Sequence, residues 1–303
     1  MLFCKPSKQF SLNLKRNELN QPQKIAYLGP AATYSHEAAL KQFGPAAEFL
    51  PMRSIPDVFF ATARREVDFG IVPVENSLEG SVTYTLDMFA RPDAELANLT
   101  ISAELYLPIV TNLLVGPNGP QSLAEVELVY SHPQPLAQSR VWLQQNLPHV
   151  TFQEASSTAR AAELALENPR AGAISNRQTA EQYGLRIMAP AIQDADFNQT
   201  RFLIIGYQPY EAVAGQTGRA TTAIMLSIKD RMGALHAITS IFVKYGLNMN
   251  RIESRPSKQK AWDYFFFIDF NGYPSEPNVA AALEELNDET SWVKVLGSWL
   301  REF

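Results

Sequence analysis

The chain has 303 residues, a length that favours two domains, each large enough to bury its own core. Hydrophobic residues make up 46% of it and charged residues 19%, which is typical of a folded globular protein and argues against intrinsic disorder. Residues 25–218 hold 11 basic and 20 acidic side chains and residues 219–303 hold ten of each, so we expect no nucleic-acid partner.

Residues 1–24 carry five Lys or Arg and one Glu, but no apolar core of a secretory signal follows them. We therefore predict a disordered tail here rather than a targeting peptide. No apolar run approaches the roughly 20 residues of a membrane span, so no membrane partner is expected. Cys4 is the only cysteine, which excludes an internal disulfide and favours a reducing, cytoplasmic location.

Strands and helices alternate in the first part of the chain. A short apolar strand is predicted at Ile25–Leu28, followed by a helix that Ser35 caps and that ends at Phe43. Ser54 begins a second amphipathic helix, and Ile71–Val74 follows as a buried strand. This alternation predicts a parallel sheet with helices on both faces.

A second alternating series follows. It comprises a strand at Leu107–Val115, a strand at Val126–Tyr130, a helix at Leu136–Gln145, an alanine-rich helix after Ser157 and a strand at Ala171–Ser175. Two α/β lobes with a cleft between them fit this order. Small ligands bind in such clefts, at the C-terminal ends of strands.

The segment 207–220 holds Gly and Pro without periodicity, so we predict a linker there. A new unit follows, with strands at Ala223–Ile228, Asn248–Ser254, Tyr264–Phe270 and Trp292–Leu296 and helices at Leu235–Tyr245 and Val279–Leu286. This βαββαβ order is that of a ferredoxin-like domain. Its sheet has an exposed edge, so we expect pairing with a second copy.

Two polar segments follow predicted strands. Glu75-Asn76-Ser77 ends the strand Ile71–Val74 and reads either as a helix cap or as a ligand site. Ser131-His132-Pro133 follows Val129-Tyr130 and reads either as a proline-stiffened loop or as a site. His132 could act as a general base, but a lone His before a Pro is more often a loop or capping residue.

A third apolar strand begins at Leu203 and is preceded by the polar segment Asn198-Gln199-Thr200-Arg201-Phe202. The guanidinium of Arg201 could form a bidentate pair with a carboxylate, or it could be a solvated side chain at the edge of a strand. No segment has the spacing of a zinc site, a phosphate loop or a dinucleotide fingerprint. We therefore expect neither a metal nor a cofactor.

Taken together, these segments resemble the prephenate dehydratase family over nearly all of the chain from Ile25 onwards. The motifs that carry the resemblance are Leu28-Gly29-Pro30 with Thr33-Tyr34-Ser35, Glu75-Asn76-Ser77 with Gly80, Ser131-His132-Pro133-Gln134 with Gln138, Ser157-Thr158-Ala159, and Asn198 with Thr200-Arg201-Phe202. The C-terminal unit resembles an ACT regulatory domain, through Gly233-Ala234-Leu235 and Glu253-Ser254-Arg255-Pro256.

The resemblance implies an α/β fold with a two-lobed, periplasmic-binding-protein-like catalytic domain and a ferredoxin-like ACT domain. The expected divisions are a disordered tail at 1–24, the catalytic domain at 25–206, the linker at 207–220 and the ACT domain at 221–303. The family most often has Gly where this chain has Ala32, which raises the question of a positive φ there. Only 24 residues precede the first strand, so we do not expect the chorismate mutase domain that many bacterial relatives carry.

The resemblance further implies a carbon-oxygen lyase of phenylalanine biosynthesis, which converts prephenate to phenylpyruvate, CO2 and water without a cofactor. Thr200 would hydrogen-bond or protonate the departing hydroxyl, and Arg201 would pair with a substrate carboxylate. The other expected catalytic residues are Asn76, Ser77, Ser131 and Gln138. The expected substrate-binding residues are Glu75, Thr33, Tyr34, Ser35, Ser157, Thr158, Asn198 and Phe202.

For regulation, the resemblance places phenylalanine at the interface of two ACT units, in a homodimer or homotetramer. The residues expected around it are Gly233, Ala234, Leu235, Asn248, Glu253, Ser254, Arg255 and Pro256. Two alternatives stay open at this point. Arogenate dehydratases have the same plan, and a non-catalytic amino-acid sensor or solute-binding protein has a similar two-lobed architecture.

Overall fold

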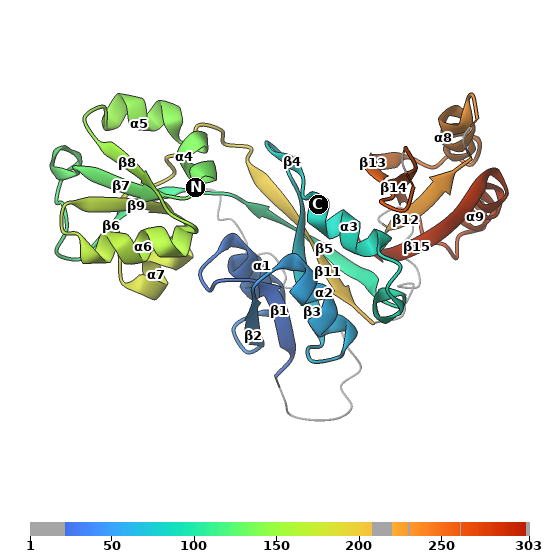
Figure 1. The fold of residues 1–303 in the computed structure, drawn as a ribbon, viewed down its shortest axis with the longest axis horizontal. Helices are drawn as coiled ribbons and strands as arrows, with labels where there is room; N and C mark the ends of the chain where they lie inside the picture. Colours follow the sequence, from blue (N-terminus) through green and yellow to red (C-terminus); the bar gives the residue numbers. More distant parts are fainter. Residues whose placement is uncertain (1–21, 208–219, 230, 261, 301–303) are drawn as a thin grey trace, which may run out of the picture.

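The computed structural model describes residues 22–207, 220–229, 231–260 and 262–300. Most of the predicted tail and most of the predicted linker lie outside these described residues. Figure 1 shows three bodies side by side: a central lobe, a second lobe to its left, and a C-terminal domain to its right. The central lobe contacts both of the others.

The central lobe contains residues from both ends of the catalytic region. Its elements are β1 (Lys24–Leu28), α1 (Tyr34–Phe43), β2 (Glu48–Met52), α2 (Ile55–Ala63), β3 (Phe69–Asn76), β4 (Gly80–Ser81), α3 (Thr83–Ala90), η1 (Ala94–Leu96), β5 (Thr100–Pro108) and β11 (Gln199–Gly206). Strands β2, β1 and β3 are parallel, but β11 runs antiparallel to both β3 and β5. The sheet is therefore mixed rather than parallel throughout, because β11 returns to it from the second lobe.

The first helix begins two residues earlier than predicted. Thr33, not Ser35, is its N-cap: its backbone is extended and its hydroxyl accepts a hydrogen bond from the backbone N–H of His36. Ser54 caps α2 as predicted, accepting from Asp57 N–H. Strand β2 was not predicted, because this edge strand buries none of its residues fully.

The second lobe follows a crossover at 109–111. Its elements are β6 (Asn112–Val115), η2 (Leu123–Glu125), β7 (Leu128–Ser131), α4 (Pro133–Gln138), α5 (Arg140–Asn146), β8 (Thr151–Glu154), α6 (Thr158–Glu167), β9 (Ala171–Ser175), α7 (Arg177–Tyr183) and β10 (Arg186–Ala189). The strand order is β10-β6-β9-β7-β8, with β7, β8 and β9 parallel to one another. The predicted strand Leu107–Val115 is thus two strands in two lobes, and the predicted helix Leu136–Gln145 is two short helices.

The C-terminal domain has the predicted βαββαβ order. Its elements are β12 (Ala220–Ile228), α8 (Ala234–Lys244), β13 (Met249–Pro256), β14 (Tyr264–Asn271), α9 (Pro277–Glu289) and β15 (Thr290–Leu300). The strands are antiparallel in the order β13-β14-β12-β15. Ile224, Ile268 and Phe270 point from this sheet into a core shared with α8 and α9.

The other face of this sheet packs on the central lobe. Met225 and Phe267 join Val72 and Leu203 in one continuous hydrophobic cluster. At Gly297, β15 pairs with Ile101 of β5 so closely that a Cβ atom would lie 2.1 Å from the Ile101 carbonyl oxygen. Only glycine allows this approach, through which strands β15 and β5 join the sheets of the two domains edge to edge. Such an apolar junction fixes the C-terminal domain on the central lobe.

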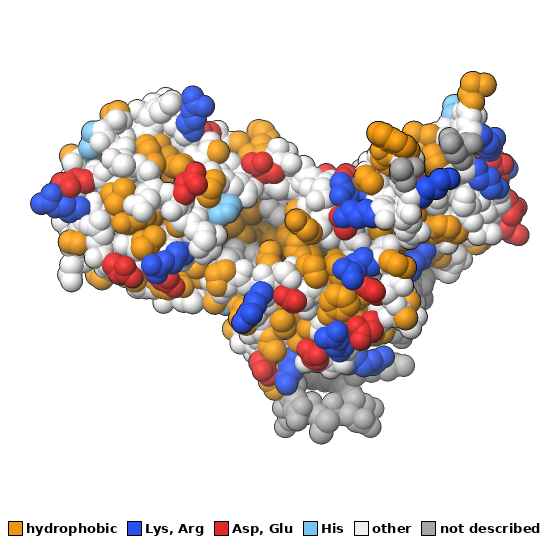
Figure 2. Space-filling model, in the orientation of Figure 1, with side chains coloured by type: hydrophobic (Ala, Val, Ile, Leu, Met, Phe, Trp, Pro, Cys, Tyr) orange, Lys and Arg blue, Asp and Glu red, His pale blue; other side chains and the backbone are white. Residues whose placement is uncertain are grey.

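Among the described residues, no helix is both long and apolar enough to span a membrane. The surface in Figure 2 carries acidic and basic side chains interspersed over all three bodies.

Candidate active site

Strands β3 and β11 form a ribbon between the second lobe and the C-terminal domain. Asn76 pairs with Thr200 across this ribbon, and the preceding Glu75 pairs with Arg201. Because side chains alternate along a strand, the Asn76–Thr200 pair and the Glu75–Arg201 pair lie on opposite faces. The two faces have different chemistry, and each is described in turn.

Asn76 is the centre of the first face and is 7% exposed. Its side-chain nitrogen donates to Thr200 Oγ1 and to Asn198 Oδ1, both at 2.9 Å. Its side-chain oxygen accepts from the backbone N–H groups of Leu78 and Glu79. These four contacts fix the orientation of the amide, so that the Thr200 oxygen accepts a hydrogen bond and its own proton is left to donate elsewhere.

A chain of amides extends this contact to the second lobe. Asn198 donates to Gln138 Oε1 at 3.0 Å, and Gln138 donates to Glu79 Oε1 at 3.2 Å. Gln138 belongs to α4 of the second lobe, whereas Asn76 and Glu79 belong to the central lobe. The structure thus brings together Asn76, Gln138, Asn198 and Thr200, four of the residues that the motifs identified. Glu79, which holds Gln138, was not among the predicted residues.

Ser77 lies at the rim of this cluster. Its hydroxyl donates to the Phe197 carbonyl at 3.1 Å and accepts from Gln199 N–H at 3.0 Å. It therefore ties the end of β3 to the segment that enters β11.

The second lobe contributes the ends of two parallel strands. Ser131 ends β7, is fully buried and donates to the His132 carbonyl at 2.8 Å. Ser157 and Thr158 follow β8, where Ser157 caps α6 by accepting from Arg160 N–H. His132 caps α4 by accepting from Gln134 N–H, which supports its interpretation as a capping residue rather than as a general base.

The turn after β1 connects the two lobes. Ala32 has a φ of 62°, so the positive φ considered for this position is present although the residue is not glycine. His36 Nδ1 accepts from Ala32 N–H at 3.1 Å, and Thr179 of α7 donates to the Ala32 carbonyl at 2.9 Å. Contacts from both lobes thus hold this backbone conformation.

Neighbouring residues of α1 face the second lobe too. Asn176 donates to Glu37 Oε2 at 2.7 Å, a contact that sequence reasoning missed because neither residue belongs to a motif we identified. Burial raises the pKa of Glu37, although this hydrogen bond acts in the opposite direction.

Tyr34 donates to the Val110 carbonyl in the crossover at 3.1 Å. Burial, and to a smaller extent the charge of Glu37, raises the pKa of Tyr34. Tyr34 is therefore a neutral donor. Ser35 is buried beside it.

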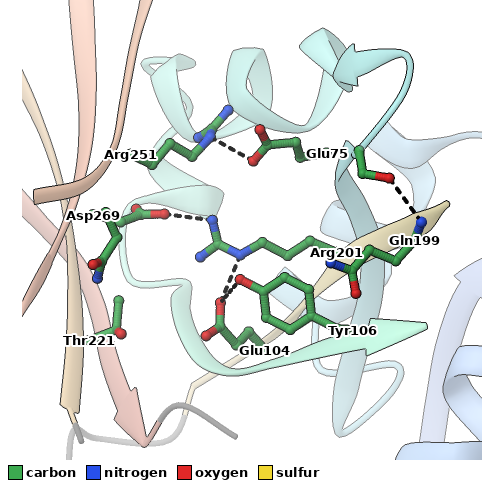
Figure 3. A pocket seen from close by; sticks show the side chains of 10 residues that line it. Glu75, Glu104, Tyr106, Gln199, Arg201, Thr221, Arg251 and Asp269 are labelled. Carbon is green, nitrogen blue, oxygen red and sulfur yellow. Dashed lines mark hydrogen bonds and ion pairs between the residues drawn. The ribbon is translucent and has the colours of Figure 1, made fainter. Parts of the chain in front are cut away.

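The second face of the ribbon differs from what we expected of it. Arg201 does not point into the space between the lobes. Its guanidinium donates to Glu104 of β5 at 2.7 Å and to Asp269 of β14 at 2.6 Å (Figure 3). Burial lowers the pKa of Arg201, but the carboxylates of Asp269 and Glu104 outweigh burial, and the net shift is upward. The guanidinium is charged and already paired with two carboxylates.

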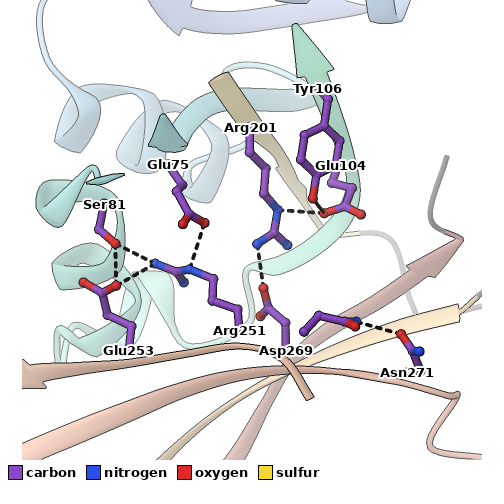
Figure 4. A network of polar contacts seen from close by, with 10 residues as sticks. Glu75, Ser81, Glu104, Tyr106, Arg201, Arg251, Glu253, Asp269 and Asn271 are labelled. Carbon is purple, nitrogen blue, oxygen red and sulfur yellow. Dashed lines mark hydrogen bonds and ion pairs between the residues drawn. The ribbon is translucent and has the colours of Figure 1, made fainter. Parts of the chain in front are cut away.

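Glu75 lies on this face as well, where it pairs with Arg251 of β13 at 3.1 Å (Figure 4). Arg251 also contacts Ser81 and Glu253, which hydrogen-bond each other. A pocket of about 240 Å³ opens between the two domains at this point. Its lining consists of Glu75, Ser77, Glu104, Tyr106, Gln199, Arg201, Thr221, Asn250, Arg251 and Asp269.

Two further expectations change with the structure. Phe202 is 1% exposed and packs with Tyr27 and Ile204 in the core of the central lobe, so it contributes packing rather than a substrate contact. Glu253 and Arg255 were expected at an effector site between two ACT units. They instead face the central lobe, where Glu253 contacts Ser81 and Arg255 pairs with Asp87 at 3.1 Å.

The remaining residues expected around the effector lie on other surfaces of the C-terminal domain. Gly233 has a φ of 80° and caps α8, and Ala234 begins that helix. Leu235 is 42% exposed, and Asn248 donates to Asn250. Ser254 and Pro256 are exposed on the edge strand β13 and alternate with Glu253 and Arg255. Within the described residues, no group of three His, Cys, Asp or Glu side chains is arranged to hold a metal.

Comparison with known proteins agrees with this architecture. The family model described as prephenate dehydratase matches residues 25–210, and the ACT domain model matches residues 222–288. A bifunctional chorismate mutase/prephenate dehydratase of Aquifex aeolicus is 46% identical over 93% of this chain and 74% of its own. The prephenate dehydratase of Bacillus subtilis is 36% identical over 91% of this chain and 98% of its own.

A crystal structure of a prephenate dehydratase from Arthrobacter aurescens in complex with L-Phe superposes with a TM-score of 0.81. It is 33% identical, and the match covers 92% of this chain and 90% of that one.

Proposed function

The chain belongs to the prephenate dehydratase family and carries an ACT domain, and we propose from this that it converts prephenate to phenylpyruvate under the control of phenylalanine. Prephenate loses its ring carboxylate as CO2 and its 4-hydroxyl as water in this reaction. Because the product is aromatic, the step is strongly downhill. The protein must chiefly hold the dianion and assist the departing hydroxyl, and positioning with fixed electrostatics suffices for that.

The hydrogen bond from Asn76 to Thr200 is the observation that best supports this proposal. Since Thr200 Oγ1 accepts from Asn76 Nδ2 at 2.9 Å, the Thr200 hydroxyl can donate its proton to a leaving oxygen in the cleft. Threonine is a poor acid, so its contribution is an oriented hydrogen bond at the place where negative charge develops. Gln138 and Asn198 hold Asn76 in position and complete the polar wall.

We propose that neutral groups of both lobes bind the dianion between them. Ser157 and Thr158 follow β8 of the second lobe, and Thr33 follows β1 of the central lobe. Thr33 and Ser157 cap helices of ten residues each, and helix N-termini favour an anionic group. Arg201 and Glu75 take no part in this binding, because their side chains lie on the opposite face of the ribbon.

Regulation requires a second copy of the chain. We propose that the edge strand β13 pairs with its equivalent in another subunit, in a homodimer or homotetramer, with phenylalanine bound where the two ACT units meet. Ile252 on this edge is 45% exposed and Leu235 is 42% exposed, so both are accessible to a partner. Gly233, Asn248, Ser254 and Pro256 would surround the effector. The single cysteine is compatible with the cytoplasmic location that we propose.

The experiment that tests the function is an assay of purified protein with prephenate and, in parallel, with arogenate. Formation of phenylpyruvate from prephenate, at a rate that phenylalanine changes, is the expected result. Preferential use of arogenate would make the chain an arogenate dehydratase. Binding of phenylalanine with turnover of neither substrate would make it a sensor, the other alternative that the two-lobed fold allows.

A further inference from the structure

Two ion-paired bridges join the ACT domain to the ribbon that carries the candidate active site. Arg201 is the neighbour of Thr200 in β11 and donates to Asp269 of β14. Glu75 is the neighbour of Asn76 in β3 and pairs with Arg251 of β13. Figure 4 shows both bridges reaching from the ACT sheet to the ribbon. Since neighbouring Cα atoms are about 3.8 Å apart, each bridge is anchored one residue away from a member of the Asn76–Thr200 pair.

The Arg201 bridge is stiff because it is buried. The side chains of Arg201 and Asp269 are both 8% exposed, and that of Glu104 is 1% exposed. Because this ion pair is largely removed from solvent, separating the guanidinium from either carboxylate is costly, so Arg201 should follow its partners when they move. Trp299 of β15 adds a second contact from the ACT domain, with the guanidinium 6.0 Å from its ring centroid.

The two carboxylates on Arg201 come from different domains. Glu104 lies on β5 of the central lobe, in the same sheet as Arg201 itself, whereas Asp269 belongs to the ACT domain. Both carboxylates bond the same guanidinium at nearly the same distance, 2.7 and 2.6 Å. Glu104 therefore holds Arg201 relative to its own lobe, and Asp269 holds it relative to the ACT domain.

We propose that Asp269 and Arg251 are positioning residues of the ACT domain for the dehydration, and that the effector changes turnover through the two bridges that these residues make. This inference rests on the proposed function, which supplies the reaction and the effector. An effector that favours one arrangement of the ACT sheet moves Asp269 and Arg251, and these displace Arg201 and Glu75. The Asn76–Thr200 pair then gains or loses its alignment with the leaving hydroxyl, which is a coupling between two distinct sites.

The decisive experiment compares Asp269→Asn with Glu104→Gln, since each removes one charge from the same guanidinium. We expect both variants to lower kcat about tenfold with little change in KM, because each loosens Arg201 and displaces the neighbouring Thr200. The ratio of rates with and without phenylalanine separates them. It should approach one in Asp269→Asn, stay near the wild-type value in Glu104→Gln, and return in part in Asp269→Glu.

A wild-type ratio in Asp269→Asn would overturn the inference, and so would an equal loss of the ratio in both variants, because that would indicate a merely structural role. If Asp269→Asn does not fold, Glu75→Gln replaces it: Glu75 is 40% exposed, and its loss breaks only the Arg251 bridge. This variant should bring the ratio closer to one, while its thermal unfolding temperature stays close to that of the wild type.

Hydrogen exchange separates this inference from the proposed function. Even if the wild type consumes no prephenate, added phenylalanine should change the amide exchange of the peptide 199–206. Asp269→Asn should lose that change, and Glu104→Gln should keep it. No change in the wild type would contradict the coupling whatever the substrate is.

Discussion

The central lobe meets its two neighbours through contrasting chemistry. Towards the second lobe it presents amides and hydroxyls, where Asn76 and Asn198 form a hydrogen-bonded chain with Gln138 of that lobe. Towards the ACT domain it presents ions, with Arg201 and Glu75 paired across the junction. One ribbon of two strands supplies both surfaces by alternation of its side chains. On the proposal made above, the reaction takes place on the neutral face, and the charged face connects that face to the ACT domain.

The largest effect we predict concerns the charged face. Arg201→Met leaves Glu104 and Asp269 buried without their cation, which should lower the free energy of unfolding by about 3–5 kcal/mol. Urea unfolding of the purified variant measures this change. Adding Asp269→Asn and Glu104→Gln to Arg201→Met removes the stranded charges and should recover part of the loss. A change below about 1 kcal/mol would mean that Arg201 behaves as a surface residue.

A substitution on the neutral face should lower turnover while leaving stability nearly unchanged. Thr200→Ala removes the hydroxyl beside Asn76 and should lower kcat by about 10²–10³, as the loss of one oriented donor does in other enzymes. The thermal unfolding temperature and ligand binding should stay close to those of the wild type. Thr200→Ser keeps the hydroxyl and is the matched control. Full activity in Thr200→Ala would refute the assignment of Thr200 to the reaction.

The smallest effect concerns the junction of the two lobes, where two ionisable groups, His36 and Glu37, take part in the contacts. Burial lowers the pKa of His36, whose Nδ1 accepts from Ala32 N–H and so must be unprotonated. The unfolded chain takes up this proton at a higher pH than the folded chain does. Stability should therefore fall as pH decreases from about 6.5, the unfolded pKa, towards the lower folded one.

His36→Gln keeps an acceptor for Ala32 but cannot titrate, so this decrease should be smaller in the variant. Unfolding free energies measured between pH 7 and pH 5, at constant ionic strength, test this. Glu37 contributes with the opposite sign, since its raised folded pKa makes its carboxyl less destabilising as pH falls. An identical slope in wild type and variant would exclude His36 as the group responsible.

The order of elements could be predicted from the sequence because periodicity and capping residues are local. The βαββαβ unit, Ser54 as a cap and the strand Ala171–Ser175 all follow from short windows of residues. The crossover at 109–111 lies inside a mostly apolar stretch, so two strands of different lobes were predicted as one. The edge strand β2 was missed because it has no buried face to give it a pattern.

The candidate site was predictable only as a set of motifs. Sequence alone placed Thr200 and Arg201 together, because they are adjacent. It could not show that Asp269, which lies 68 residues further on, bonds Arg201 from the other side. Side chains that are adjacent in a strand point to opposite faces of it. Which of them faces the second lobe and which faces the ACT domain depends on how these two bodies pack on the ribbon, and the sequence does not show that packing. The hydrogen bond between Asn176 and Glu37 could not be predicted either, because it forms only where the two lobes come into contact.

The most direct test of the two-face account is a steady-state comparison of Arg201→Lys with the wild type, using prephenate as substrate. The account predicts a KM near the wild-type value with a lowered kcat and a weakened response to phenylalanine, because the lysine keeps the charge but cannot bond Glu104 and Asp269 together as the guanidinium does. A KM raised about thirtyfold or more, with the phenylalanine response intact, would show that Arg201 binds the substrate carboxylate and would contradict the account.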